Sequence, residues 1–185
     1  REQRPRAAAV QVRHQPQRQG EGGPKRRKAQ GGQFGNPALV AAAHAHSPYG
    51  KSFSSLGIPL APLTQDACIF YDDHTVIVEQ GGAVVFEIEA GKELAAKFPT
   101  GKAAIHQNHG LFTVGETVDE AAFWFVSMER SCQAQLMAMA AGTPIEINDE
   151  YASYTREQTG FHLAGWFAFQ PLWQEICRTD PELFD

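Results

Sequence analysis

The sequence has few cysteines and no long apolar run. Its 185 residues include only three cysteines, and no two of them form a C-x-x-C pair: Cys68, Cys132 and Cys177. This pattern excludes a disulfide framework and favours a reducing, cytoplasmic compartment. Every apolar stretch is interrupted well before the ~20 residues that a membrane-spanning helix needs, and the N-terminus lacks the pattern of a signal peptide. We therefore expect a soluble protein with no membrane partner.

The first 36 residues lack the residue types that build a core. They contain no Leu, Ile, Met, Trp, Tyr or Cys, and nine Lys or Arg stand against two acids. Such a composition cannot bury enough apolar surface to offset chain entropy, so we predict a disordered, basic tail over 1–36. Its basic run 24–28 is interpreted as solvated rather than as a nuclear-localisation or nucleic-acid patch. No aromatic side chains are interleaved with it, so we expect no specific nucleic-acid partner.

From residue 37 onward the sequence has the pattern of one folded domain. Residues 37–185 carry nineteen acidic side chains against seven basic ones. Short apolar runs predict strands and longer periodic runs predict helices. The predicted strands are 37–46, 102–107 and 111–114, with a hairpin of 75–79 and 83–87, and the predicted helical segments are 52–56, 91–98 and 118–141. This mixture predicts an α/β sandwich, in which the aromatic-rich stretch 166–173 packs rather than binds a cofactor.

The most distinct predicted element is the helix that follows Thr117. Thr117 and Glu120 form a capping box, in which the hydroxyl and the carboxylate each bind a backbone N–H. Apolar side chains recur at helical spacing until Gly142, so this helix should pack on the core through Ala121, Phe125, Met128, Cys132, Leu136 and Met139. We interpret Glu129 and Arg130 on this helix as solvated or interface charges.

Three of the seven histidines are placed to bind a metal. Residues i and i+2 of a strand face the same side, so His44 and His46 project together from the end of an apolar strand. His109 follows a second predicted strand and precedes Gly110, where the chain can turn sharply. Three His ligands with an open fourth position are typical of a catalytic zinc site. His106 is a competing third ligand, but its place inside the strand pattern favours a core or supporting role.

Four motifs occur in order along the folded part of the chain. They are His44-Ala45-His46-Ser47-Pro48-Tyr49-Gly50, Leu60-Ala61-Pro62-Leu63-Thr64-Gln65-Asp66-Ala67, Gln107-Asn108-His109-Gly110-Leu111 and Val114-Gly115-Glu116-Thr117-Val118-Asp119-Glu120-Ala121. These motifs closely resemble the class II aldolase/adducin family, which includes fuculose-phosphate and rhamnulose-phosphate aldolases, ribulose-phosphate 4-epimerases and related decarboxylases. The resemblance extends from Pro37 to the end of the 118–141 helix.

The resemblance implies a fold, a metal and an assembly. The fold would be a three-layer α/β/α sandwich around a mostly antiparallel sheet. Zn²⁺, or another divalent metal, would be held by His44, His46 and His109. The chain would form a homotetramer with its sites at subunit interfaces. Asp66 and Tyr71 occupy the stretch that in family members reaches into a neighbouring subunit's site, which makes them the catalytic candidates. The alternative for Asp66 is a turn or cap carboxylate, and for Tyr71 a half-buried strand residue.

The resemblance also implies an activity. The metal would support retro-aldol C–C cleavage, or related enediolate chemistry, on a small sugar phosphate or hydroxy-keto acid. Epimerase and decarboxylase versions of this chemistry are alternatives. The family's carboxylate base lies about twenty residues before the H-x-H pair, with phosphate-binding loops further upstream. The only acid in the corresponding region here is Glu21, flanked by glycines, so we expect the family's N-terminal segment to be missing.

A second function of a different class is also consistent with the resemblance. The same fold serves in adducin as an interaction module associated with actin and the cytoskeleton, without catalysis. Adducin-type domains lack the metal histidines, so the joint presence of His44, His46 and His109 favours the enzyme. The unmatched base favours the interaction module.

Overall fold

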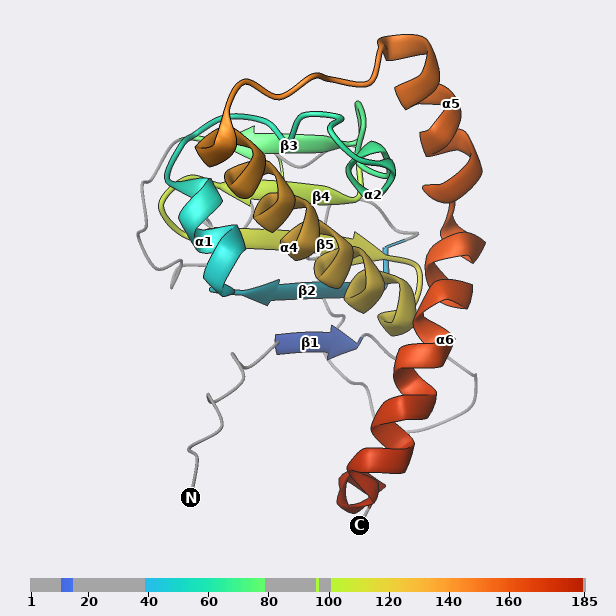
Figure 1. Cartoon of the computed structure of the whole chain (residues 1–185). Coiled ribbons are helices and arrows are strands. Elements are labelled where there is room, and N and C mark those ends of the chain that lie inside the picture. Colours follow the sequence, from blue (N-terminus) through green and yellow to red (C-terminus); the bar gives the residue numbers. More distant parts are fainter. Residues whose placement is uncertain (1–10, 15–38, 79–95, 97–100, 185) are drawn as a thin grey trace.

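A five-stranded mixed sheet forms the centre of the protein. The computed structural model describes residues 11–14, 39–78, 96 and 101–184 (Figure 1). The strands lie in the order β1-β2-β5-β4-β3. They are β1 (Gln11–His14), β2 (Ala41–Ala45), β3 (His74–Ile77), β4 (Ala103–His106) and β5 (Gly110–Gly115). All neighbouring pairs are antiparallel except β3 and β4, so the prediction of a mostly antiparallel sheet in an α/β fold is confirmed.

The central strands follow the predicted apolar runs. In β2, Ala41, Ala43 and Ala45 are buried and alternate with half-buried residues, which is the period of two that a strand requires. β4 is buried along its whole length, as expected for a strand inside the sheet. Gly110 opens β5 against the carbonyl oxygen of Ala45, where a Cβ would lie only 2.7 Å away, so no larger residue fits there.

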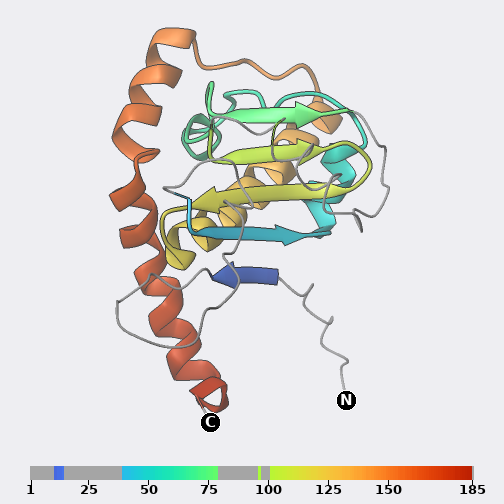
Figure 2. The ribbon, with the colours of Figure 1, turned by 180° about the vertical axis from the view of Figure 1, so that it is seen from behind.

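The helices cover one face of the sheet and stand beside one end of its strands (Figure 1). They are α1 (Pro48–Ser54), α2 (Gln65–Cys68), α4 (Val118–Ala141), α5 (Asp149–Thr159) and α6 (His162–Thr179), followed by a 3-10 turn, Pro181–Phe184. α4 crosses in front of the strands with α1 beside it, and the strands cover both when the molecule is seen from behind (Figure 2). The predicted α/β/α sandwich has helices on both faces of the sheet. The described residues do not include a second helical layer on the opposite face. The helix predicted for 91–98 lies outside them apart from Ala96.

α4 follows its prediction closely, with two differences. The Thr117 hydroxyl accepts the N–H of Glu120, but the Glu120 carboxylate accepts the N–H of Glu116 rather than that of Thr117. The predicted core positions Ala121, Phe125, Met128 and Cys132 are buried and Leu136 is partly buried, and the unpredicted Trp124 is fully buried. Met139 is 42% exposed, so its predicted core position is wrong; residues 139–142 of the last turn are all exposed.

The aromatic stretch of the tail packs less than predicted. It lies in α6, where Trp166, Phe167 and Trp173 are 37%, 71% and 41% exposed, so the packing prediction is wrong for these three side chains. α6 contacts α4 through the buried Gly165, which faces the Trp124 ring. Because successive helical residues are rotated by about 100°, Trp166 and Phe167 turn away from this contact.

The predicted disorder of residues 1–36 does not hold for Gln11–His14. These four residues form the edge strand β1, which pairs antiparallel with β2 from Gln11 opposite His44 to His14 opposite Ala41. The unpaired backbone N–H and C=O groups at the edge of β2 can form hydrogen bonds with another strand. This pairing does not require apolar side chains on that strand. The rest of 1–36 and the second predicted hairpin strand, 83–87, lie outside the described residues. Within the described part of the chain, no helix has the length and apolar character to cross a membrane.

Candidate metal centre

The sheet brings three histidines to one end of the fold. β2 and β5 are neighbours, and their register places His44 opposite Phe112 and Ala45 opposite Leu111. His46 is the first residue after β2. His109 lies in the turn between β4 and β5, where Asn108 adopts a left-handed conformation (φ +57°) and the His109 N–H donates to the His106 carbonyl. Asparagine is one of the few residues that tolerate this conformation, so the Asn-His-Gly sequence suits the turn.

The imidazoles of His44, His46 and His109 form a compact cluster. One ring nitrogen from each lies within 4.8 Å of those of the other two. The ring centroids are 5.2 Å apart for His44 and His46, 5.1 Å for His44 and His109, and 4.6 Å for His46 and His109. His106 is outside this set of three; its fully buried ring stacks on His109 at 4.8 Å. The cluster therefore consists of the three histidines that the sequence singled out.

His44 is held in one orientation by its strand neighbours. Its Nδ1 lies 2.8 Å from the carbonyl oxygen of Leu111, and because a carbonyl can only accept, Nδ1 carries the proton. The ring of Phe112 stacks on His44 with centroids 3.8 Å apart and planes within 6°. Nε2 of His44 is therefore unprotonated, and its lone pair is free to bind a metal, as in many metal-binding histidines. Phe112 was not predicted from the sequence, although its position opposite His44 follows once β2 and β5 are paired.

The electrostatics of the cluster favour neutral imidazoles. Burial is the main cause that lowers the pKa of His44, against the opposing effect of its hydrogen bond to Leu111. Burial, together with the neighbouring histidines, lowers the pKa of His109 from 6.5 to about 4. Neutral imidazole is the form that binds a metal. Three converging neutral nitrogens, one fixed by a backbone carbonyl, fit a divalent ion of the Zn²⁺ type.

The lowered pKa of His109 predicts acid-sensitive stability of the metal-free protein. Below pH 6.5 the unfolded chain binds a proton at this residue, whereas the folded chain does not until about pH 4. The free energy of unfolding should therefore decrease from pH 7.5 to pH 5. Thermal unfolding in the presence of a chelator measures this dependence. In His109→Gln the free energy of unfolding should decrease less between pH 7.5 and pH 5. An identical pH dependence in the variant would contradict the role of His109 in this loss of stability.

Asp66 and Tyr71 lie away from the histidines. Asp66 is exposed on α2, at the end of the sheet opposite α1 (Figure 1). Tyr71 follows α2; its carbonyl accepts from Arg156 Nη1 at 3.2 Å, and a hydrogen bond to Asp149 raises the pKa of its phenol. Within one chain, neither predicted catalytic residue joins the histidine cluster.

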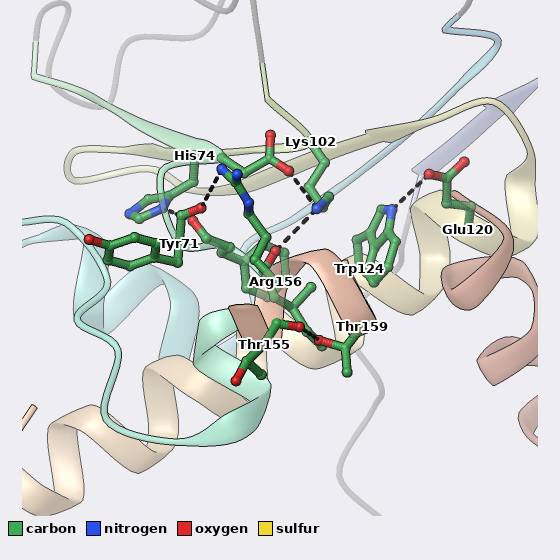
Figure 3. A network of polar contacts seen from close by, with 11 residues as sticks. Tyr71, His74, Lys102, Glu120, Trp124, Thr155, Arg156 and Thr159 are labelled. Carbon is green, nitrogen blue, oxygen red and sulfur yellow. Dashed lines mark hydrogen bonds and ion pairs between the residues drawn. The ribbon is translucent and has the colours of Figure 1, made fainter. Parts of the chain in front are cut away.

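A second polar cluster lies where α2, α5 and α4 meet (Figure 3). Lys102 Nζ pairs with Asp73 Oδ2 at 2.5 Å, donates to the Ile69 carbonyl at 3.1 Å, and lies 5.0 Å from the centroid of the Trp124 ring. Burial lowers the pKa of Lys102, and the Asp73 carboxylate counteracts this shift. Each interaction is internal to the fold, so we assign this cluster a structural role.

Glu129 is not the freely solvated charge that was one of the two predictions for it. Its carboxylate lies against the segment that follows His46 and accepts hydrogen bonds from the Ser47 hydroxyl and from the N–H groups of Tyr49 and Gly50. The residue is only partly exposed. Because the partners are about eighty positions away in sequence, no local pattern in α4 could reveal them.

Comparison with known proteins places the chain in a family. Residues 35–136, which contain all three histidines, match the family model described as "Class II Aldolase and Adducin N-terminal domain". The chain belongs to the class II aldolase and adducin family. The resemblance inferred from the four motifs is thereby confirmed, as is the α/β fold with a mostly antiparallel sheet that it implied.

Three family members illustrate the range of relatives. Decarboxylase NovR of Streptomyces niveus is 44% identical over 147 residues, which is 80% of this chain and 54% of NovR. A 4-hydroxy-3-prenylphenylpyruvate oxygenase/4-hydroxy-3-prenylbenzoate synthase of Streptomyces roseochromogenus subsp. oscitans is 42% identical over 80% of this chain and 53% of its own length. The structure of L-fuculose 1-phosphate aldolase from Glaciozyma antarctica PI12 superimposes with a TM-score of 0.70 at 42% identity, covering 80% of this chain and 55% of that one. The chain spans about half the length of these relatives.

Proposed function

We propose that this protein is a metal-dependent, class II aldolase-like lyase. It would catalyse retro-aldol C–C cleavage, or related enediolate chemistry, on a small sugar phosphate or hydroxy-keto acid. The observation that carries this proposal is the convergence of His44, His46 and His109, whose ring nitrogens lie within 4.8 Å of one another. Zn²⁺ or another divalent metal, when bound, supplies a Lewis acid that stabilises negative charge on substrate oxygens.

The histidines of the cluster and their neighbours have separate roles in the proposed site. Leu111 fixes the proton of His44 on Nδ1, and Phe112 covers one face of that ring and keeps water from it. His46 is exposed and His109 is partly exposed, so the cluster can be reached from solvent. A substrate with two neighbouring oxygens, such as a hydroxy-ketone, suits such an open three-histidine centre.

Candidates for the acid/base group lie both near the histidine cluster and far from it. Glu129 is close in the fold, but both oxygens of its carboxylate are already engaged in hydrogen bonds from Ser47, Tyr49 and Gly50. Asp66 on α2 and Tyr71 just after it lie at the end of the sheet opposite α1, so we propose that they act at the cluster of another copy. This requires the homotetramer with shared sites that the family resemblance implied.

The names of the relatives are consistent with two reactions, decarboxylation and aldol cleavage. One relative is named a decarboxylase and another is a fuculose 1-phosphate aldolase, and both names describe loss of a C–C bond next to an oxygenated carbon. The alternative, an actin-associated interaction module without catalysis, is less favoured because it gives the three converging histidines no role. A cytoplasmic setting stays a prediction.

The test begins with protein loaded with Zn²⁺ and separated from free metal. Elemental mass spectrometry should find about one zinc per chain. The loaded protein is then incubated with L-fuculose 1-phosphate, other ketose phosphates and hydroxy-keto acids, and the cleavage products or released CO₂ are measured. We expect turnover that a chelator removes and that added Zn²⁺ restores. Absence of metal binding, together with cosedimentation with actin filaments, would replace this proposal with the interaction module.

A further inference from the structure

The N-terminus of α1 is capped by a residue from another helix. The amides of a helix's first turn have no acceptor within the helix. In α1, Pro48 has no N–H, and Lys51 donates to the Ser47 carbonyl. The two remaining donors, the N–H groups of Tyr49 and Gly50, bind the Glu129 carboxylate at 2.9 and 2.6 Å. Glu129 thereby satisfies every first-turn amide that α1 cannot satisfy itself.

Ser47 joins the same carboxylate. As the residue before the helix, it would ordinarily cap the first turn with its own hydroxyl. Here it makes no such bond, and its Oγ instead donates to Glu129 Oε2 at 2.5 Å. Three donors from one four-residue segment therefore converge on one side chain of α4. A negative charge at a helix N-terminus is also favourable to the helix dipole.

This segment directly follows a proposed metal ligand. The ladder between β2 and β5 ends with Ala45 opposite Leu111, so His46 lies just beyond this ladder. The next residue, Ser47, is bound to Glu129. On its other side α1 rests on β5, where a Cβ on Gly50 would lie 2.5 Å from Leu111 Cδ1. His46 is therefore held between the end of the strand and a helix whose start is fixed by Glu129.

We propose that Glu129 is a positioning residue for the metal centre. Its carboxylate fixes the start of α1 and thereby the direction in which His46 faces His44 and His109. The inference rests on the proposed function to the extent that the cluster binds a metal. Both carboxylate oxygens are needed, because Oε1 accepts from Tyr49 while Oε2 accepts from Ser47 and Gly50. An amide in this place would turn its NH₂ group toward at least one donor.

Titration with Co²⁺ distinguishes a positioning role of Glu129 at the metal centre from an effect on the stability of the whole fold. Co²⁺ reports the geometry of its ligands through its visible absorption, and its binding does not depend on turnover. We expect Glu129→Gln to weaken Co²⁺ binding about 10–100-fold, as loss of groups that orient metal ligands does elsewhere, and to change the absorption spectrum. The matched control is Glu157→Gln, which removes the same charge from an exposed position on α5 and should bind like the wild type.

A second control addresses a merely structural effect. Glu120 is a buried carboxylate in the first turn of α4 that accepts hydrogen bonds from Trp124 Nε1 and the Glu116 N–H. Glu120→Gln should lower the unfolding temperature but leave the Co²⁺ affinity and spectrum unchanged. Equal weakening by Glu120→Gln and Glu129→Gln would overturn the positioning role, as would wild-type affinity in Glu129→Gln.

The remaining outcomes are also decisive. If Glu129→Gln does not fold, Ser47→Ala removes one of the three donors; reduced Co²⁺ affinity in that variant supports the proposal, and wild-type affinity overturns it. If the wild-type protein binds neither Co²⁺ nor Zn²⁺, the proposed function fails together with this inference. If it binds metal and only the effect of Glu129→Gln is missing, the inference alone fails.

Discussion

His109→Ala is expected to abolish stoichiometric metal binding. The side chain supplies one of three converging nitrogens and is the only ligand of the set contributed by the turn between β4 and β5. Removing it leaves two ligands from one short segment. We expect the affinity to fall by more than the roughly 100-fold that loss of a residue supporting a ligand costs. The measurement is zinc content after equilibrium dialysis, with the wild-type protein beside it.

This variant is preferable to the corresponding change at His44. His44→Ala should also release metal, but it removes the Leu111 hydrogen bond and the Phe112 stacking, so stability would fall for reasons unrelated to metal. His162→Gln, which alters a histidine on α6, is the control and should retain wild-type zinc content. Undiminished zinc in His109→Ala would instead make His106, which stacks on His109, the third ligand.

Trp124→Ala is expected to cause the largest loss of stability. The side chain is fully buried, and its Nε1 donates to Glu120 Oε1 at 3.0 Å. Its ring packs edge-on against Phe70. The Lys102 ammonium lies 5.0 Å from the centroid of the Trp124 ring (Figure 3). Truncation should cost about 3–5 kcal/mol, as for other buried aromatic residues. Urea unfolding followed by circular dichroism measures the change.

The contact between Trp124 and Gly165 gives this prediction an internal control. A Cβ on Gly165 would overlap Trp124 Cζ2, so Gly165→Ala should destabilise the wild-type protein by about 1–3 kcal/mol. In the Trp124→Ala background the space is free, and the same change should be nearly neutral. Such non-additivity is the sign of a direct contact. Additive effects, or a loss below about 1 kcal/mol for Trp124→Ala, would contradict the packing between α4 and α6.

The sequence predicted the elements whose signal is local. The apolar runs of β2, β4 and β5 and the capped periodic helix α4 were identifiable because burial imposes their periodicity. The pair His44 and His46 followed from the strand period of two. The helix α1 was predicted as a turn over 52–56, whereas it begins at Pro48. The Ser-Pro sequence at 47–48 was a usable start signal, since proline is favoured at the first helical position.

What the sequence did not predict depends on contacts between distant elements. Phe112 stacks on His44 only because β2 and β5 pair in one register, and Glu129 meets Ser47 only because α4 crosses α1 at that point. The exposed aromatic side chains of α6 were misjudged because this helix contacts α4 through a glycine rather than through its largest residues. The strand β1 is a backbone pairing, for which composition carries little signal.

The cap that Glu129 places on α1 also affects how the backbone exchanges hydrogen with water. Amide protons in a first helical turn ordinarily exchange quickly, because they lack an acceptor within the helix. Those of Tyr49 and Gly50 are bound to a carboxylate from α4, so opening them requires α1 and α4 to separate. Two slowly exchanging amides at the start of a seven-residue helix would report this contact by NMR, residue by residue and without any metal.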